Sequence, residues 1–188
     1  STKWKKNLIV LLNKMLNQSN KIFLIGFMGC GKSTLGKKLA NNLNISFIDL
    51  DKRIEEVEGK TISEIFATGG EDCFREIETQ QLINLINTED NYVVALGGGV
   101  PCFNKNMESI NSAGTSVYLK YNAGILISRL INAKEQRPLV AGKTKEELSI
   151  FVEQLLKQRE LFYLKSDIVV EGNNITVSQV SELLFKNS

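Results

Sequence analysis

Glycine, lysine and serine residues recur between Gly26 and Ser33 at the spacing of a phosphate-binding loop. The segment reads GFMGCGKS and matches GxxxxGKS, with the apolar run 22–25 before it and a helical run, 34–43, after it. In such loops, backbone N–H groups and the positive end of the following helix bind phosphate oxygens, while the lysine reaches the β and γ phosphates. We therefore predict a nucleoside-triphosphate site formed by Gly29, Cys30, Gly31, Lys32, Ser33 and Thr34.

Two acidic residues, Asp49 and Asp51, follow the next apolar run. Residues two apart on an extended chain point to the same side. Beside a phosphate loop, Asp49 could hold Mg²⁺ through water, together with the Ser33 hydroxyl, while Asp51 faces an acceptor hydroxyl. The alternative is that both are ordinary loop acids or helix N-caps, which are common where strands end.

Three consecutive glycines, Gly97, Gly98 and Gly99, follow a third apolar run. Glycines expose backbone N–H groups and leave room where a side chain would block a ligand. We expect the triplet to line the site of the acceptor. A plain strand-to-helix turn is the alternative, although one glycine would normally suffice for it.

Two arginines lie within or beside apolar helical stripes. Arg159 interrupts the stripe of the helix that begins after Thr144, and Arg75 lies beside the apolar face of an earlier helix. A buried arginine needs an anionic partner, so either an internal carboxylate or a carboxylate of the ligand must meet it. For Arg75, the internal alternative is an ion pair with Glu71 or Glu78.

A polar stretch, 134–143, separates two predicted helices and carries Arg137. An arginine on a segment that moves can swing over a phosphoryl group during transfer. We expect a mobile lid over about 132–143, with Arg137 as a catalytic group. A plain surface loop is the alternative.

All these candidates fall among alternating apolar runs and helical patterns, the arrangement of a parallel sheet covered by helices. We predict an α/β fold with a five-stranded parallel sheet flanked by helices. Threonines three residues before Glu or Gln mark helix starts at Thr61, Thr144 and Thr176. The predicted strands are 22–26, 46–49, 92–96, 115–119 and 167–170.

Composition excludes several classes of function. The 188 residues, 43% of them hydrophobic, suffice for one domain core, and no apolar run is long enough to cross a bilayer. A net charge of +2 argues against charge-driven nucleic-acid binding, and the absence of histidine excludes Ser/His/Asp hydrolysis. The three cysteines have no CxxC spacing, so we expect no disulfide framework, no structural zinc and a cytoplasmic location.

Residues 1–19 differ from the remainder, since they hold four lysines and no acidic residue. Their apolar residues recur at helical spacing, which predicts an amphipathic helix. Three roles stay open for this basic extension: packing on the domain, an artefact of the start site, and contact with a membrane or a partner. We expect residues 20–188 to form a single catalytic domain.

Taken together, the motifs resemble those of the shikimate kinase family over residues 20–185, in the family's order. The resemblance extends to ISEIFA at 62–67, GExxFR at 70–75 and RPL at 137–139. It implies a P-loop fold like that of the nucleoside-monophosphate kinases, with a substrate-binding insert at about 49–80. It also implies transfer of the γ-phosphoryl group of MgATP to the 3-hydroxyl of shikimate, a step of aromatic amino-acid biosynthesis.

The resemblance also assigns chemical roles to candidate residues. Lys32 and Arg137 would attend the transferred phosphoryl group. Asp51 would orient the acceptor hydroxyl and accept its proton. Ser33 and Asp49 would organise Mg²⁺, the latter through water.

Binding roles follow from the same resemblance. Arg129 and the 173–174 loop would lie near the adenine. Cys30 departs from the family, which often has serine or alanine at this position, and would add a thiol beside the phosphates. Shikimate would be held by Asp51, Arg75, Gly97, Gly98, Gly99 and Arg159.

Two other functions remain as alternatives: another small-molecule kinase on the same fold, such as a gluconate kinase, and a nucleotide-binding module without catalysis. Two cationic anchors, Arg75 and Arg159, beside a glycine triplet favour a compact acceptor that bears a carboxylate. We expect a monomer whose partners are the small molecules ATP and shikimate, with no nucleic acid and no membrane.

Overall fold

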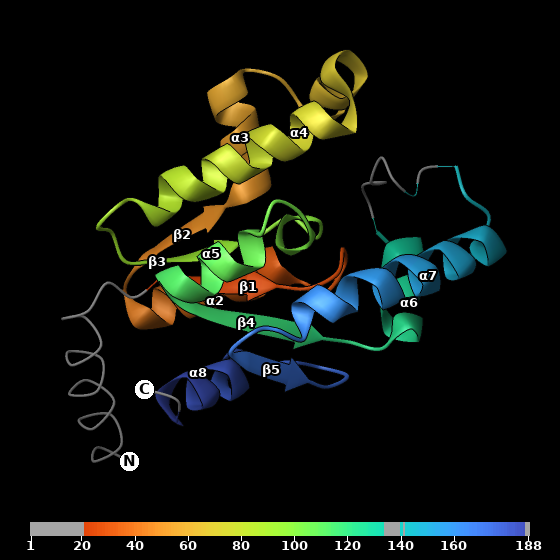
Figure 1. The fold of residues 1–188 in the computed structure, drawn as a ribbon. Helices are drawn as coiled ribbons and strands as arrows, with labels where there is room; N and C mark the ends of the chain where they lie inside the picture. The colour runs from red at the N-terminus through yellow and green to blue at the C-terminus, as the bar shows by residue number, and fades with distance from the viewer. Residues whose placement is uncertain (1–20, 134–139, 141, 187–188) are drawn as a thin grey trace.

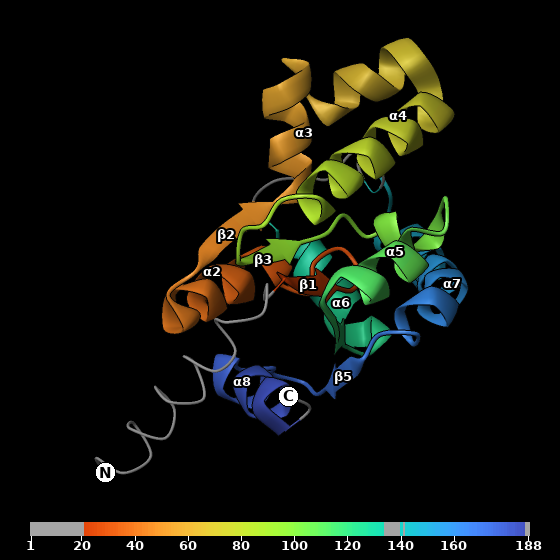
Figure 2. The same cartoon turned by 60° about the vertical axis from the view of Figure 1, so that its left-hand side comes forward.

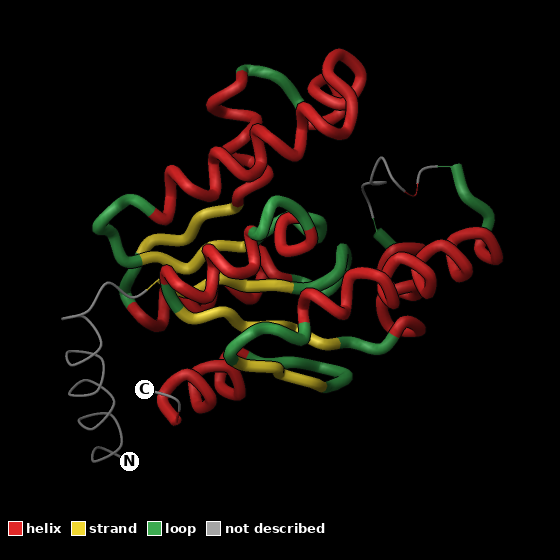
Figure 3. The backbone as a smooth tube through the Cα atoms, in the orientation of Figure 1, coloured by secondary structure: helices red, strands yellow, loops and turns green. Residues whose placement is uncertain are grey.

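A parallel β-sheet forms the centre of the computed structural model, which describes residues 21–133, 140 and 142–186 (Figures 1 and 3). The strand order is β2-β3-β1-β4-β5, and every neighbouring pair is parallel. The predicted five-stranded α/β fold is therefore confirmed. The strands are β1 (Lys21–Ile25), β2 (Ser46–Asp49), β3 (Tyr92–Ala95), β4 (Thr115–Lys120) and β5 (Ile168–Glu171).

Strand register brings the predicted site residues to one edge of the sheet. Strand β1 lies between β3 and β4 and is buried along its whole length. Asp49, the last residue of β2, pairs with Ala95, the last residue of β3. Because the carboxyl ends of parallel strands meet at one edge, the phosphate loop after β1, the acids after β2 and the glycine triplet after β3 must lie close together.

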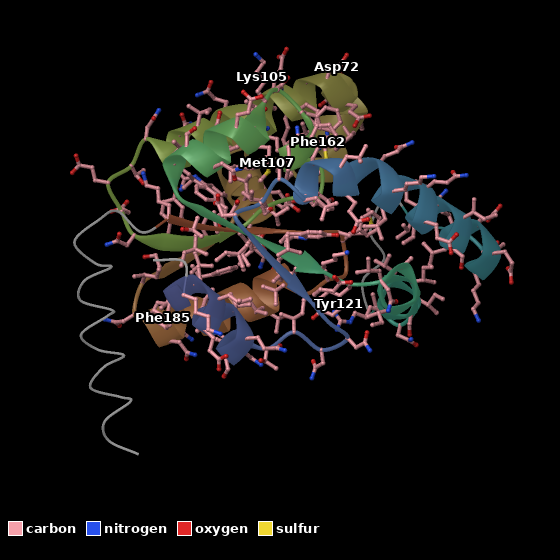
Figure 4. The ribbon with its side chains drawn as sticks, turned by 60° about the horizontal axis from the view of Figure 1, so that its bottom comes forward. Asp72, Lys105, Met107, Tyr121, Phe162 and Phe185 are labelled. Atoms are coloured by element: carbon pink, nitrogen blue, oxygen red, sulfur yellow. The ribbon has the colours of Figure 1, made fainter. Side chains whose placement is uncertain are left out.

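Helices cover both faces of the sheet. Helices α2 and α8 pack together on one face, while α5 and α7 lie on the other (Figures 2 and 4). No helix in the described part of the chain is long and apolar enough to cross a membrane. The helices are α2 (Lys32–Leu43), α3 (Leu50–Glu58), α4 (Ile62–Ile86), the 3₁₀ turn η1 (Val100–Cys102), α5 (Asn106–Ala113), α6 (Ala123–Ile131), α7 (Lys145–Tyr163) and α8 (Val177–Lys186).

Reciprocal hydrogen bonds mark the three predicted helix starts. At Thr61, the hydroxyl oxygen accepts a bond from the Glu64 N–H (3.2 Å), and the Glu64 carboxylate accepts one from the Thr61 N–H (2.7 Å). The same reciprocal pair is present at Thr144 and at Thr176. Each pair satisfies two N–H groups that a helix start leaves without partners, so these predictions are confirmed.

Several element boundaries differ from the prediction by one or two residues. Strand β1 begins and ends one residue early because Gly26 has a φ of 151° and already belongs to the loop. Strand β3 ends one residue early, β4 ends one residue late, and β5 is shifted by one residue toward the C-terminus. Helix α2 begins two residues before the predicted helical run, because the left-handed Gly31 (φ 89°) caps it.

Helix α4 is broken at Gly70, whose φ of 74° and ψ of −174° are not helical. Helix α3 and the first part of α4 project away from the sheet, and the part after the break returns toward β3 (Figure 1). The returning part carries Arg75 and Glu78. The break therefore turns these side chains back toward the edge of the sheet. That residues 49–80 act as a substrate-binding insert stays a prediction.

Candidate active site

The phosphate loop joins β1 to α2 and holds its own lysine. Gly29 and Gly31 have left-handed φ values of 80° and 89°, which side chains with a Cβ rarely adopt. The Lys32 ammonium group donates hydrogen bonds to the carbonyl oxygens of Gly26 (2.8 Å) and Phe27 (3.1 Å). Its positive charge is therefore held against the loop backbone, at the N-terminus of α2, where a phosphate would bind.

Ser33 and Asp49 meet as the sequence predicts for a magnesium site. The Ser33 hydroxyl donates a hydrogen bond of 2.7 Å to the Asp49 carboxylate. Among the described residues, no group of three His, Cys, Asp or Glu side chains gathers to hold a metal. A hydroxyl and one carboxylate suit Mg²⁺, which usually takes its remaining ligands from water and substrate phosphates.

One cavity of about 230 Å³ joins the phosphate loop, the acidic pair and the glycine triplet. Its floor is the carboxyl edge of β3. A wider depression of about 710 Å³ lies at the opposite ends of the strands, near residues 40–46 and 90–91, and its lining includes no cationic side chain to attract a phosphate. The smaller cavity is lined by Met28, Gly29, Gly31, Lys32, Ser33, Thr34, Asp49, Asp51, Ala95, Leu96, Gly97 and Gly98.

Each glycine of the triplet 97–99 lies against a different predicted binding residue. A Cβ atom on the first glycine would lie 2.8 Å from a carboxylate oxygen of Asp51. On the second it would lie 3.1 Å from Arg159 Nη1, and on the third it would overlap the Arg75 guanidinium. Three side chains from α3, α4 and α7 thus converge on a backbone that only glycine allows, which is more than a strand-to-helix turn requires.

Arg75 forms the internal ion pairs that the sequence left as an alternative. The residue is 8% exposed. Its Nε and Nη2 donate to one oxygen of Glu71 (3.3 and 3.0 Å), and its Nη1 donates to Glu78 (2.8 Å). These bonds use three of the five guanidinium N–H groups, so Arg75 retains donors for a second anion.

Arg159 is equally buried, with 9% exposed, but its surroundings differ. Within the described residues, no carboxylate forms an ion pair with it. Its guanidinium lies 5.9 Å from the centre of the Phe27 ring, and Tyr163, one turn further along α7, donates a hydrogen bond to the carbonyl oxygen of Gly98. Within the described structure Arg159 therefore interacts with the Glu78 carboxyl group only at longer range, and a ligand carboxylate could form the direct ion pair that is missing.

Glu78 is the residue of this cluster whose importance the sequence did not reveal. It is 1% exposed, and burial raises its pKa to about 7. Arg75 opposes the rise through its charge and hydrogen bond, the Asp51 carboxylate adds to the rise, and Arg159 opposes it. The sequence named Glu78 only as an alternative ion-pair partner, since the spacing of three residues on a helix shows proximity but not burial.

We expect a Glu78→Gln substitution to change how stability depends on pH. Between about pH 4.5 and 7 the unfolded chain loses the Glu78 proton while the folded chain keeps it, so raising the pH destabilises the wild-type fold. Glutamine removes this titration, so the melting temperature of the variant relative to wild type should rise from pH 4.5 to 8. Exposed Glu76 on the same helix is the control, and Glu76→Gln should give no such trend. If the difference in melting temperature between Glu78→Gln and wild type stays constant from pH 4.5 to 8, the raised pKa of Glu78 is wrong.

Two other predicted nucleotide residues have contacts that the sequence did not show. Cys30 is only 2% exposed and does not line the cavity; its sulfur packs against Gly26 and accepts a contact of 3.7 Å from the Lys32 ammonium group. Its part in nucleotide binding stays a prediction. Arg129 donates hydrogen bonds to the carbonyl oxygens of Cys30 (3.3 Å) and Gly29 (3.5 Å), and its guanidinium lies 4.3 Å from the centre of the Tyr121 ring. Arg129 thus braces the phosphate loop, and its contact with adenine stays a prediction. Arg137 lies outside the described residues.

Both the sequence and the fold of the chain are similar to those of known proteins. The model of the shikimate kinase family matches residues 28–187. The shikimate kinase of Azobacteroides pseudotrichonymphae is 48% identical over 165 residues, which cover 88% of this chain and 97% of that protein. The solved shikimate kinase of Bacteroides thetaiotaomicron has a TM-score of 0.84 and 41% identity, covering 88% of this chain and 98% of its own. The Acinetobacter baumannii shikimate kinase, solved in complex with shikimate, has a TM-score of 0.82 and 32% identity, covering 93% and 98%. A chain with this cavity, and with such similarity along most of its length, belongs to the shikimate kinase family.

Proposed function

We propose that the chain transfers the γ-phosphoryl group of ATP to the 3-hydroxyl of shikimate, giving shikimate 3-phosphate and ADP. One observation carries the choice of acceptor. Buried Arg159, which has no ion pair among the described residues, lies against Gly98 in the lining of the phosphate-loop cavity, and Arg75, with donors to spare, lies against the next residue, Gly99. Two buried guanidinium groups beside a small cavity favour a compact acceptor that bears a carboxylate.

Transfer would rely on positioning and charge neutralisation, because the transition state for phosphoryl transfer is loose. The loop N–H groups would bind the β and γ phosphates, and Lys32 would neutralise charge on the transferred group. Asp51 faces the same cavity and would orient the acceptor hydroxyl. It would accept the proton late, when the oxygen becomes acidic as it bonds phosphorus, so no strongly raised pKa is required.

Ser33 and Asp49 would hold the magnesium ion of MgATP, Asp49 through water. The ion would supply positive charge to the β and γ phosphates of the bound nucleotide. Their hydroxyl and carboxylate groups are hydrogen-bonded to each other, and both residues line the cavity together with Lys32. The two residues and the lysine would then surround the phosphates from different elements, α2 and β2.

Three further parts complete the proposal. Arg137 would close over the phosphoryl group from the segment between α6 and α7, as in the family that the chain belongs to. Arg129 would contact adenine as well as brace the loop. The free thiols of Cys30, Cys73 and Cys102 are consistent with a reducing cytoplasm, and the chain would act there as a monomer.

Acceptor-dependent release of ADP tests the proposed function. We expect MgATP turnover to rise by at least about 100-fold when shikimate is added, because an open site without an acceptor only hydrolyses ATP slowly. Gluconate and a nucleoside monophosphate, added in place of shikimate, should leave the background rate unchanged. A larger rate with gluconate would instead favour another small-molecule kinase, and slow turnover indifferent to every acceptor would favour a nucleotide-binding module.

A further inference from the structure

The turn after η1 adopts a conformation that needs support from outside itself. Asn104 and Lys105 have φ values of 50° and 58°, so two successive residues with side chains lie in the left-handed region. Such residues carry strain that the surrounding structure must offset. Strain of this kind suggests that the position of the turn matters to something beyond the chain connection.

Helix α4 supplies the support. Asn104 donates hydrogen bonds to the Thr79 hydroxyl (2.9 Å) and to the carbonyl oxygen of Arg75 (3.5 Å). Asn106 donates to the same hydroxyl (3.1 Å) and to the carbonyl oxygen of Val100 (3.0 Å). The turn is thus tied to the stretch of α4 that carries Arg75.

These hydrogen bonds fix the position of Phe103, which precedes the turn. Its ring centre lies 4.4 Å from the central carbon of the Arg75 guanidinium, closer than that of Phe74 at 5.2 Å. Phe103 is nevertheless 37% exposed. Because an exposed aromatic ring contributes less to the core than a buried one, we regard the stacking on Arg75 as the main specific contact of Phe103.

Stacking on Phe103 adds a further restraint on the orientation of the Arg75 guanidinium. Glu71 and Glu78 bind it along its edges, and the Phe103 ring covers one face. A planar guanidinium fixed at its edges and on a face is restricted in rotation, so its remaining N–H groups keep one direction. A fixed direction is what binding of a carboxylate by a planar group requires.

We propose that Phe103 is a positioning residue, which orients Arg75 for the carboxylate of the acceptor. The inference rests on the proposed function, because it needs Arg75 to bind that carboxylate. Phe103 itself touches no reacting atom. Its effect is expected on acceptor binding, with little effect on ATP binding or on the chemical step.

The test compares Phe103→Leu, which removes the aromatic face but keeps an apolar side chain, with Phe103→Tyr, which keeps the face. We expect Phe103→Leu to raise the KM for shikimate by about two- to tenfold, the range of a cation–π contact that is partly shielded from water. The KM for ATP and kcat should change by less than about twofold. Phe103→Tyr should restore the wild-type KM for shikimate.

Phe185→Leu is the matched control, because the same atoms are removed from a partly buried phenylalanine on the side of the sheet opposite the Lys105 turn (Figure 4). It should leave both KM values unchanged. Melting curves and calorimetric titration of shikimate accompany the kinetics, so that loss of fold is separated from loss of affinity.

Three results would overturn the inference: an unchanged KM for shikimate in Phe103→Leu, an equal rise in Phe103→Tyr, or a rise in both KM values together with a lower melting temperature. In each case wild type and Phe185→Leu should still release ADP in response to shikimate. If wild type itself shows no response to shikimate, the proposed function is wrong and this inference falls with it.

Discussion

Lys32→Met is expected to lower kcat by about 10²- to 10³-fold, because it removes one charged donor from the phosphoryl group at the moment when charge develops there. Methionine fills a similar volume, so the loop should keep its shape. The ammonium group donates to the carbonyl oxygens of two buried residues, Gly26 and Phe27, so the variant must be shown to stay folded without these two bonds. Steady-state release of ADP, with shikimate saturating, measures the effect.

Lys38→Met is the matched control for this substitution. Lys38 is an exposed lysine on the same helix, two turns from the loop, and its loss should leave kcat within about twofold of wild type. A melting curve for both variants checks that the fold is intact. The assignment of the phosphate loop would be contradicted if Lys32→Met, still folded, retained more than about a tenth of wild-type turnover.

The second large effect is expected at Arg159. Arg159→Lys keeps the positive charge but loses the planar pair of N–H donors that binds both oxygens of a carboxylate. We expect the KM for shikimate to rise by about 10- to 100-fold, the range of one hydrogen bond to a charged group. The KM for ATP should move by less than about twofold, because no residue of α7 lines the phosphate-loop cavity within the described structure.

Lys157→Arg, the reverse change at an exposed position on α7, is the control and should alter neither KM. If Arg159 serves packing alone, Arg159→Lys should instead lower the melting temperature and affect both substrates together. An unchanged KM for shikimate with a lowered melting temperature would refute binding of the carboxylate by Arg159.

The parts of the site that are local in the sequence could be predicted from it. The phosphate loop, Asp49 and the glycine triplet each follow directly after an apolar run, and parallel strands bring such positions to one edge. Helix starts were equally predictable, because a capping box involves residues only three apart. The end of β1 lies one residue before the predicted end, because the backbone of Gly26 already has the conformation of the loop.

Burial and side-chain direction depend on packing between distant segments, and the sequence did not determine them. The spacing of Glu71, Arg75 and Glu78 allowed ion pairs, but not the burial that raises the pKa of Glu78. The place of Cys30 in the motif predicted a thiol beside the phosphates, but it did not show that the side chain is buried against Gly26 and the Lys32 ammonium group. No pattern in the sequence indicated a role for Phe103, because its stacking on Arg75 depends on a left-handed turn that α4 holds in place.

The most direct test of the central claim, that buried arginines select an acceptor by its carboxylate, compares shikimate with its methyl ester as acceptors for the wild-type chain. The ester keeps the ring and all three hydroxyls but carries no charge. The account predicts that kcat/KM for the ester is at least about 100-fold lower than for shikimate, because a site built for a charged group leaves its buried donors unpaired when the charge is missing. Equal kcat/KM values for the acid and the ester would contradict it.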